Sequence, residues 1–399
     1  MNRQLFMEVA QKYETPAYVF DLDIFIKRIK RIKELLGENI QLCYAMKANP
    51  FLISSAASYV DRFEVCSPGE YAICQRADLH GKRIVLSGVN KEEAEVKRVM
   101  REGGAGVYTV ESLHQLELLE MCAKECSIQV SVILRLTGNN QFGMEKEQIR
   151  GIMENRDQYP HLFIKGLQMY TGTQKKKFHK IQQEVTQLAQ FMTELKEQYA
   201  FEGNELEYGP GFYVPYFQGE DWDLEEQVCS LADTLYALPF DGTWILEIGR
   251  FLAATCGYYL TKIVDCKRNN GQNFCIVDGG IHHLNYYGQT MAMKIPFHQV
   301  ITEGDGEEEL WTVCGSLCTA GDVLVKNLPI RGAKIGDLLV FERVGAYSVT
   351  EGIYLFLSRR LPIILLYSQS EGIRMVRQGY PTDYLNEAAN QQEADLPDR

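Results

Sequence analysis

Between Gln41 and Ile248, eight short β-prone runs alternate with longer helical stretches, and this alternation restricts the fold more than any other feature of the sequence. The runs begin at Leu42, Arg62, Arg83, Gly106, Val130, Ile164, Leu206 and Trp244. The stretches between them, such as KEEAEVKRVMREG and SLHQLELLEMCAKEC, repeat apolar residues at helical spacing. Eight strands that alternate with helices predict an α/β fold of the (β/α)8 TIM-barrel type.

A second domain is predicted after about Cys256, where β-rich runs broken by turn signals replace the alternation. We expect this part to form an antiparallel β-sandwich, whose sheet the early run PAYVFD at Pro16 would join. The predicted boundaries are a barrel at residues 24–256, a β-sandwich domain at residues 1–23 and 257–385, and a disordered polar tail at residues 386–399.

Composition argues against several partners. The net charge of −12 leaves no evident basic surface for a nucleic acid. No apolar run is long enough to span a bilayer and the N-terminus lacks the pattern of a signal peptide, so we expect a cytoplasmic protein with no membrane partner. The 11 cysteines are expected to be free thiols. The sequence contains no Cys-x2-Cys pair that would indicate a metal site.

Polar residues and glycines collect at the predicted carboxyl ends of the barrel strands, where barrels of this type build their active sites. They are Lys47, Ser67, Asn90, Arg135, Tyr170, Thr173, Gly209, Glu247 and Arg250. A lysine after a strand is most often a solvated loop residue, but the residues around Lys47 favour a role in a site.

Glycine-bearing loops follow the seventh and eighth predicted strands, at Gly209 to Gly211 and at Gly249. Loops at these places commonly hold a phosphate. A lysine together with a phosphate site suggests pyridoxal phosphate, whose aldehyde needs a lysine and whose ring nitrogen needs a partner. Glu247 is either that partner or an ion-pair partner of Arg250, and spacing alone does not decide between the two.

Nine motifs in order carry a family resemblance over about Thr15 to Tyr367. They are YAMKAN, EVCSPGEY, QFG, GLQMYTGTQ, GPGF, EIGR, VDGG, CGSLCTAGDVL and GAY. In these motifs the chain resembles the fold type III, alanine racemase-like decarboxylases that depend on pyridoxal phosphate, the group containing diaminopimelate and ornithine decarboxylases. The fold of that group, a barrel plus a β-sandwich, agrees with the reading of the residues.

The resemblance implies roles for individual residues. Lys47 would bind the cofactor covalently, Glu247 would face its ring nitrogen, and Cys318 would cross the interface of a head-to-tail homodimer to donate a proton in the partner's site. The cofactor's phosphate would be held by Thr173, Gly211, Gly249, Arg250 and Tyr347, with Gly209 and Tyr170 as further cofactor contacts. A buried, inert thiol is the commonest alternative for a free cysteine.

Departures from the family pattern concern the substrate. Tyr170 stands where the diaminopimelate group has a histidine against the ring, and Ile248 replaces a proline. Thr319 follows Cys318 where these decarboxylases carry an acid for the distal ammonium. A hydroxyl cannot pair that ammonium, so we expect a conjugated or carrier-tethered amino acid. Arg135, His282 and His283 are, with Thr319, the predicted substrate contacts.

The predicted function is α-decarboxylation of such an L- or D-amino acid. Diaminopimelate decarboxylase proper is one alternative. An amino-acid racemase is another, but that group places an arginine at the ring nitrogen, where this chain has Glu247. A non-catalytic pyridoxal-phosphate protein is the third, although such carriers usually stop at the barrel and decayed homologues tend to lose the lysine.

Overall fold

The structure is a computed structural model, which describes residues 3–286, 292–302 and 305–388. The described chain divides into two compact units. The barrel unit comprises residues 24–215 and 221–254, and the sheet unit comprises residues 3–23, 216–220 and 255 onward. Residues 389–399, most of the predicted tail, lie outside the described residues.

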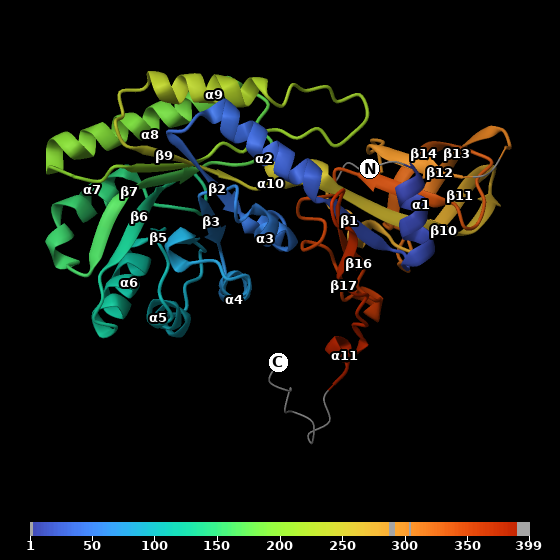
Figure 1. Ribbon diagram of the computed structural model, residues 1–399, viewed down its shortest axis with the longest axis horizontal. Coiled ribbons are helices and arrows are strands. Elements are labelled where there is room, and N and C mark those ends of the chain that lie inside the picture. The colour runs from blue at the N-terminus through green and yellow to red at the C-terminus, as the bar shows by residue number, and fades with distance from the viewer. Residues whose placement is uncertain (1–2, 287–291, 303–304, 389–399) are drawn as a thin grey trace. The chain divides into compact units, whose positions relative to one another are not determined.

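The barrel unit is a closed ring of eight strands in chain order, most of which are labelled in Figure 1. They are β2 (Ile40–Ala45), β3 (Arg62–Val65), β4 (Ile84–Leu86), β5 (Val107–Val110), β6 (Val130–Leu136), β7 (Leu162–Tyr170), β8 (Glu205–Gly209) and β9 (Thr243–Ile248). All neighbouring pairs are parallel, and each of the eight predicted runs falls on one strand. The predicted (β/α)8 barrel is confirmed.

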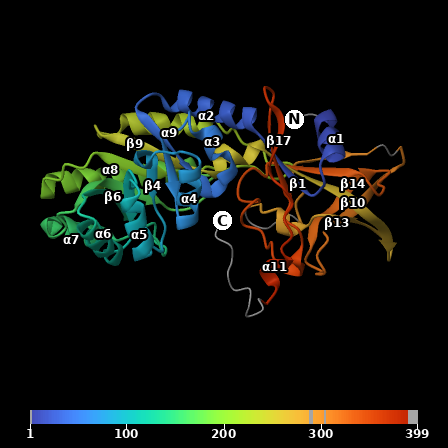
Figure 2. The ribbon, with the colours of Figure 1, turned by 60° about the horizontal axis from the view of Figure 1, so that its bottom comes forward.

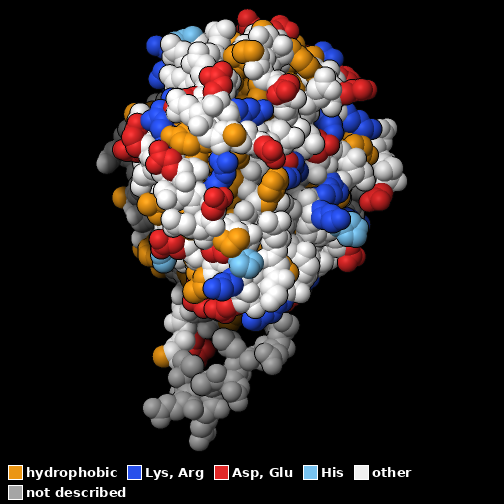
Figure 3. Space-filling view, turned by 90° about the vertical axis from the view of Figure 1, so that its left-hand side faces the viewer, with side chains coloured by type: hydrophobic (Ala, Val, Ile, Leu, Met, Phe, Trp, Pro, Cys, Tyr) orange, Lys and Arg blue, Asp and Glu red, His pale blue; other side chains and the backbone are white. Residues whose placement is uncertain are grey.

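Helix α2 precedes the first barrel strand, the other helices follow barrel strands, and together they cover the barrel from outside, as the turned view in Figure 2 shows. They are α2 (Leu22–Leu36), α3 (Ile53–Ala56), α4 (Pro68–Arg76), α5 (Glu93–Arg101), α6 (Leu113–Glu125), α7 (Lys146–Glu154), α8 (Phe178–Tyr199), α9 (Glu226–Ala237) and α10 (Arg250–Ala253). On the face in Figure 3, acidic and basic side chains are interspersed.

Among the described residues, none of the helices has the length and apolar character needed to cross a membrane.

Serine caps begin two of these helices directly after a strand. The hydroxyl of Ser67 accepts a hydrogen bond from the backbone N–H of Glu70 at the start of α4, and Ser112 does the same for Gln115 at α6. Such caps satisfy backbone donors that the helix itself leaves unpaired. They fix where the chain turns from strand to helix, which is where the site residues lie.

The sheet unit is built on nine hydrogen-bonded strands. They are β1 (Ala17–Asp21), β10 (Gly257–Asn269), β11 (Gln272–Val277), β12 (His298–Ile301), β13 (Glu308–Cys314), β14 (Val323–Arg331), β15 (Leu338–Glu342), β16 (Ile363–Ser368) and β17 (Gly372–Arg377). Helices α1 (Arg3–Lys12) and α11 (Asp383–Asn386) belong to the same unit. The predicted separate β domain is confirmed, and β1 lies within its sheet, between β10 and β16.

The strand pairing is mixed rather than wholly antiparallel. β1 runs parallel to β16 and β11 runs parallel to β13, whereas the other pairs are antiparallel. Parallel neighbours cannot be joined by a tight hairpin, and here each pair is separated by intervening chain that includes other strands. Turn signals between adjacent runs do not reveal such pairings.

One barrel loop belongs to the sheet unit. Residues 216–220, which follow β8, donate a hydrogen bond from Gln218 N to the carbonyl of Ile295 at 2.8 Å. The rings of Tyr216 and Tyr286 lie 5.1 Å apart, and both side chains are buried. Residues 216–220 thus belong to the sheet unit although they lie between two barrel strands in the sequence, which the predicted boundaries did not include.

Glu207 on β8 is an acidic side chain inside the barrel. The next residue, Tyr208, faces outward, because its hydroxyl donates to Glu184 on α8 at 2.6 Å. Since side chains alternate along a strand, Glu207 faces the barrel interior. Glu207 is fully buried, and neither carboxyl oxygen has a hydrogen-bond partner among the described residues. Burial, followed by the charge of Glu247, raises the pKa of Glu207 from 4.5 to about 8, so the carboxyl is mostly neutral at pH 7.

Replacing this carboxyl should change how stability depends on pH. Between about pH 4.5 and about pH 8, Glu207 is ionised in the unfolded chain and protonated in the folded one, so the stability of the wild type falls as pH rises. The stability of Glu207→Gln relative to wild type should therefore increase over this window and level off above it. Urea unfolding at several pH values measures this. Glu38→Gln, at an exposed carboxylate, is the control, and a flat difference for Glu207→Gln would contradict the assignment.

Candidate active site

Lys47 lies at the carboxyl end of the barrel between two carboxylates. It follows β2 in the 3-10 turn η1 (Met46–Ala48), and β2 pairs with β3 on one side and with β9 on the other. The Nζ atom lies 2.5 Å from Oε2 of Glu64 on β3 and 3.2 Å from Oε1 of Glu247 on β9. Closure of the barrel thus places one ammonium between carboxylates from both neighbouring strands.

The two carboxylates differ in how readily they ionise. Both are nearly buried, with side-chain exposures of 5% for Glu64 and 7% for Glu247. Burial opposes ionisation of Glu64, but Lys47 and a hydrogen bond from Cys66 outweigh it and lower its pKa. Burial and the charge of Glu64 raise the pKa of Glu247. Glu64 is therefore the more persistent anion, and Glu247 would gain from a further cationic partner.

Two neutral groups complete this arrangement. The side chain of Gln168 on β7 donates from Nε2 to Oε2 of Glu247 at 3.2 Å. Cys66 donates from Sγ to Oε1 of Glu64 at 3.0 Å, and its sulfur lies 3.8 Å from Nζ of Lys47. Burial raises the pKa of the Cys66 thiol, which keeps it protonated as a donor. Both carboxylates are thus held in place by hydrogen bonds as well as by Lys47.

The ring of Tyr170, at the end of β7, lies against the backbone at the end of the neighbouring strand β8. It pairs in register with Gly209, where a Cβ atom would come within 2.5 Å of the tyrosine ring. Burial, followed by the charge of Glu247, raises the pKa of Tyr170. Glycine at position 209 therefore allows a neutral aromatic ring to lie close to the strand end.

The glycine loops form a narrow backbone cradle. Gly211 adopts φ +59°, and a Cβ there would come within 2.0 Å of the carbonyl oxygen of Gly172. A Cβ at Gly249 would come within 3.0 Å of the carbonyl oxygen of Ala45. A side chain is therefore excluded at Gly211 and crowded at Gly249, which favours glycine at both positions.

Thr173 and Arg250 lie beside this cradle. Nε of Arg250 donates to Oγ1 of Thr173 at 3.3 Å, which joins the loop after β7 to the start of α10. A guanidinium and a hydroxyl next to glycine loops have the donor chemistry that a phosphate requires.

Arg135 on β6 is engaged within the barrel. Its Nη1 lies 2.9 Å from Oε1 of Glu111, and both side chains are nearly buried. The guanidinium also lies 4.8 Å from the ring centre of Phe142. Glu111 is therefore the ion-pair partner of Arg135, whose charge also acts to lower the pKa of Glu64 and of Glu247.

The predicted residues Cys318 and Thr319 belong to the sheet unit, where both are exposed on the loop between β13 and β14. The base of this loop is fixed by the buried carboxylate of Asp322. One of its oxygens accepts from the N–H of Leu317 at 2.7 Å, and the other accepts from the N–H of Ile281 at 2.7 Å. A single side chain thus joins the Cys318 loop to the turn that follows β11.

His282 and His283 lie in that turn, η6 (Ile281–His283), and are 3% and 2% exposed. Their ring centres are 3.7 Å apart, and Nδ1 of His283 is hydrogen-bonded to the hydroxyl of Tyr259 at 2.8 Å. Burial lowers the pKa of His282 to about 4 and also lowers the pKa of His283. Both rings are neutral at pH 7 and can offer a ligand hydrogen bonds but not charge.

Tyr347 is the fifth predicted residue in the sheet unit. Its backbone adopts φ +68°, which is uncommon for a residue other than glycine. Backbone conformations of this kind cluster at functional sites.

The predicted site residues therefore fall into two sets. The barrel unit carries Lys47, Arg135, Tyr170, Thr173, Gly209, Gly211, Glu247, Gly249 and Arg250, and the sheet unit carries His282, His283, Cys318, Thr319 and Tyr347. Sequence analysis missed Glu64, Gln168 and Asp322. Glu64 could have been found from the sequence, because it lies between the apolar residues Phe63 and Val65, and a charged residue there in a barrel strand indicates an inward-facing polar group.

The chain is similar to known proteins over most of its length. A family model described as "Pyridoxal-dependent decarboxylase, pyridoxal binding domain" matches residues 22–254. The chain is 26% identical to the L-glutamyl-[BtrI acyl-carrier protein] decarboxylase of Niallia circulans, over 94% of this chain and 94% of that protein. It is 27% identical to the diaminopimelate decarboxylase of Deinococcus radiodurans, over 96% of this chain and 98% of that protein.

A solved structure supports the same fold. Diaminopimelate decarboxylase from Helicobacter pylori, complexed with L-lysine, superposes with a TM-score of 0.83 at 23% identity, over 95% of this chain and 98% of that one. The family model covers more than half of the chain, and it matches the unit that carries Lys47, Glu247 and the glycine loops. The chain belongs to the pyridoxal-dependent decarboxylase family.

Proposed function

We propose that this decarboxylase binds pyridoxal phosphate through Lys47 and removes the α-carboxyl group of an amino acid whose distal end is conjugated or tethered to a carrier. The observation that carries the proposal is the Lys47 ammonium held between Glu64 and Glu247 beside a glycine cradle. When bound, the cofactor supplies an electron-withdrawing ring that accepts the electrons left as CO2 departs.

The residues at the barrel end fit such a cofactor. Thr173, Arg250 and the backbone at Gly211 would hold its phosphate, and Tyr170 would lie against its ring. Glu247 would face the ring nitrogen. Since burial raises the pKa of Glu247, a cation opposite this carboxylate would stabilise its ionised form and would itself be stabilised.

Cys318 would hold the proton that replaces the lost carboxyl group. A thiol is mostly protonated at neutral pH and can act as a general acid. The Asp322 carboxylate would keep the Cys318 loop in a fixed shape. The proposal includes the head-to-tail homodimer, in which this loop serves the neighbouring subunit, and a cytoplasmic location.

Thr319 supports the conjugated substrate, since a hydroxyl cannot neutralise a free distal ammonium. The names of two relatives agree. One acts on an L-glutamyl group attached to a carrier protein. Another, from Staphylococcus aureus and 25% identical, is a 2-[(L-alanin-3-ylcarbamoyl)methyl]-2-hydroxybutanedioate decarboxylase, whose substrate name contains an amide-linked alanine. Free diaminopimelate is the second candidate substrate, favoured by the diaminopimelate decarboxylases among the relatives.

Lys47→Ala should abolish covalent attachment of the cofactor and the visible absorbance of the purified protein. Lys47→Arg is the sharper variant, because it keeps a cation between Glu64 and Glu247 but cannot react with the aldehyde. Both variants should be colourless after incubation with pyridoxal phosphate and desalting, while Lys82→Ala, at an exposed lysine, should stay yellow. A retained chromophore in Lys47→Arg would reject the assignment.

Cys318→Ala should lower kcat by about 100-fold, the lower range for loss of a general acid, and should leave the bound cofactor in place. Single-turnover CO2 release and product stereochemistry in heavy water measure the effect. Cys266→Ala, at a half-buried thiol of the same unit, should behave as wild type. Unchanged turnover and stereochemistry in Cys318→Ala would remove this cysteine from the reaction.

Substrate choice is tested by CO2 release from free, acylated and carrier-bound amino acids. Wild type should prefer a conjugate over free meso-diaminopimelate, and Thr319→Glu should raise kcat/KM for free diaminopimelate by about tenfold, because it restores an acid for the distal ammonium. If wild type turns over free diaminopimelate as well as any conjugate, the interpretation of Thr319 is wrong.

A further inference from the structure

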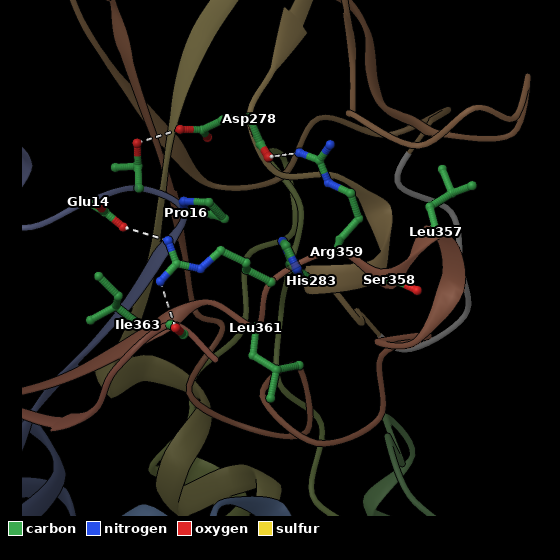
Figure 4. A pocket seen from close by; sticks show the side chains of 12 residues that line it. Glu14, Pro16, Asp278, His283, Leu357, Ser358, Arg359, Leu361 and Ile363 are labelled. Atoms are coloured by element: carbon green, nitrogen blue, oxygen red, sulfur yellow. Dashed lines mark hydrogen bonds and ion pairs between the residues drawn. The ribbon is translucent and has the colours of Figure 1, made fainter. Parts of the chain in front are cut away.

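A cavity of about 440 Å³ opens in the sheet unit, and all of its lining residues belong to that unit (Figure 4). It lies where four segments meet: the chain before β1, the end of β11 with η6, residues 357–363, and Gly379. The volume is within the range of about 300–1,000 Å³ that is typical of small-molecule sites. Of its lining residues, His283 alone is among the predicted substrate contacts.

Arg359 supplies a charge that forms no ion pair with any of the described residues. Its Nη2 donates to the backbone carbonyl of Asp278 at 3.3 Å, as Figure 4 shows. Within the described residues, this is its one hydrogen bond, and no carboxylate lies within ion-pair distance of the guanidinium. The side chain is exposed at the cavity wall. A guanidinium with one hydrogen bond to a carbonyl can still bind a planar oxyanion through its other N–H groups.

Arg360 adds a second guanidinium at the cavity wall, where its Nη2 donates to the backbone carbonyl of Gly379 at 2.9 Å. Its Nη1 lies 3.4 Å from Oε2 of Glu14, and the two side chains are 62% and 75% exposed. Ion pairs this exposed contribute little to stability, so a ligand anion can compete with Glu14 for Arg360.

The carboxylate of Asp278 also lines the cavity, and both of its oxygens accept hydrogen bonds. Its Oδ2 accepts from the hydroxyl of Thr15 at 2.5 Å, and its Oδ1 accepts from the hydroxyl of Thr261 at 2.6 Å and from the N–H of Lys262 at 3.0 Å. Three donors therefore hold the carboxylate against the sheet. It acts as a structural anchor for the end of β11.

His283 contributes a buried hydrogen-bonding group. Its ring lines the cavity although the residue is 2% exposed. Nδ1 is bonded to Tyr259, and among the described residues Nε2 has no partner. Burial lowers the pKa of His283, so the ring is neutral and offers Nε2 for a hydrogen bond rather than a charge.

The rest of the wall is apolar, with Pro16, Leu357, Leu361 and Ile363. We propose that this cavity binds an organic oxyanion, a carboxylate or a phosphate ester with a short apolar portion. Arg359 and Arg360 bind the oxyanion, and the apolar side chains cover the rest of the ligand. The site requires two guanidinium groups and apolar contact, and it does not depend on the identity of the amino-acid substrate.

Isothermal titration of the holoenzyme with three ligands of equal chain length tests the charge requirement. Hexanoate and hexyl phosphate should bind saturably, one per chain, and hexylamine should not bind. The tighter of the two anions shows whether the natural ligand is a carboxylate or a phosphate ester. Hexylamine binding as tight as hexanoate binding, or no saturable binding of either anion, would overturn the proposal.

Two variants tie the binding to this cavity. Arg359→Gln should weaken hexanoate binding at least tenfold, and Leu361→Trp should abolish it by filling the cavity without changing any charge. Arg331→Gln, at an exposed arginine on β14 outside the cavity, is the matched control and should bind as wild type does. Unchanged affinity in both Arg359→Gln and Leu361→Trp would place the anion elsewhere and refute the site.

Discussion

The site of this protein depends on one cation held between two nearly buried carboxylates. Lys47 contacts Glu64 and Glu247, which come from the strands on either side of β2. Without the ammonium, two carboxylates with side-chain exposures of 5% and 7% would repel one another, and one of them would take up a proton. The same positions are set by the parallel register of β3, β2 and β9, so the electrostatics of the site follow from closure of the barrel.

Polar groups deeper in the barrel extend this dependence. Gln168 holds the second oxygen of Glu247, and Glu207 on the neighbouring strand is a fully buried carboxyl that responds to the charge of Glu247. A protonated Glu207 adds no negative charge that would repel the Glu247 carboxylate. Two further ion pairs, Arg62 with Glu205 and Arg135 with Glu111, place charge at other points along the barrel strands.

Much of the fold could be predicted from the sequence, because local patterns determine it. Apolar runs bounded by turns mark the barrel strands, and the rule that sites lie at their carboxyl ends singles out Lys47, Tyr170 and Glu247. Glu64 and Gln168 were missed because their importance comes from contacts with side chains of other strands, which one-dimensional spacing does not show. The parallel pairs of the sheet unit and the exchange of residues 216–220 are likewise contacts between distant parts of the chain.

The place of β1 in the sheet has a consequence for how the protein is made. β1 is synthesised before the barrel, yet its two hydrogen-bonded neighbours, β10 and β16, follow the entire barrel in the chain. All five of its residues are buried in the folded protein. Until residues 257–260 and 363–367 have been synthesised, this apolar strand has two open edges, which makes the nascent chain vulnerable to aggregation and a natural client for chaperones.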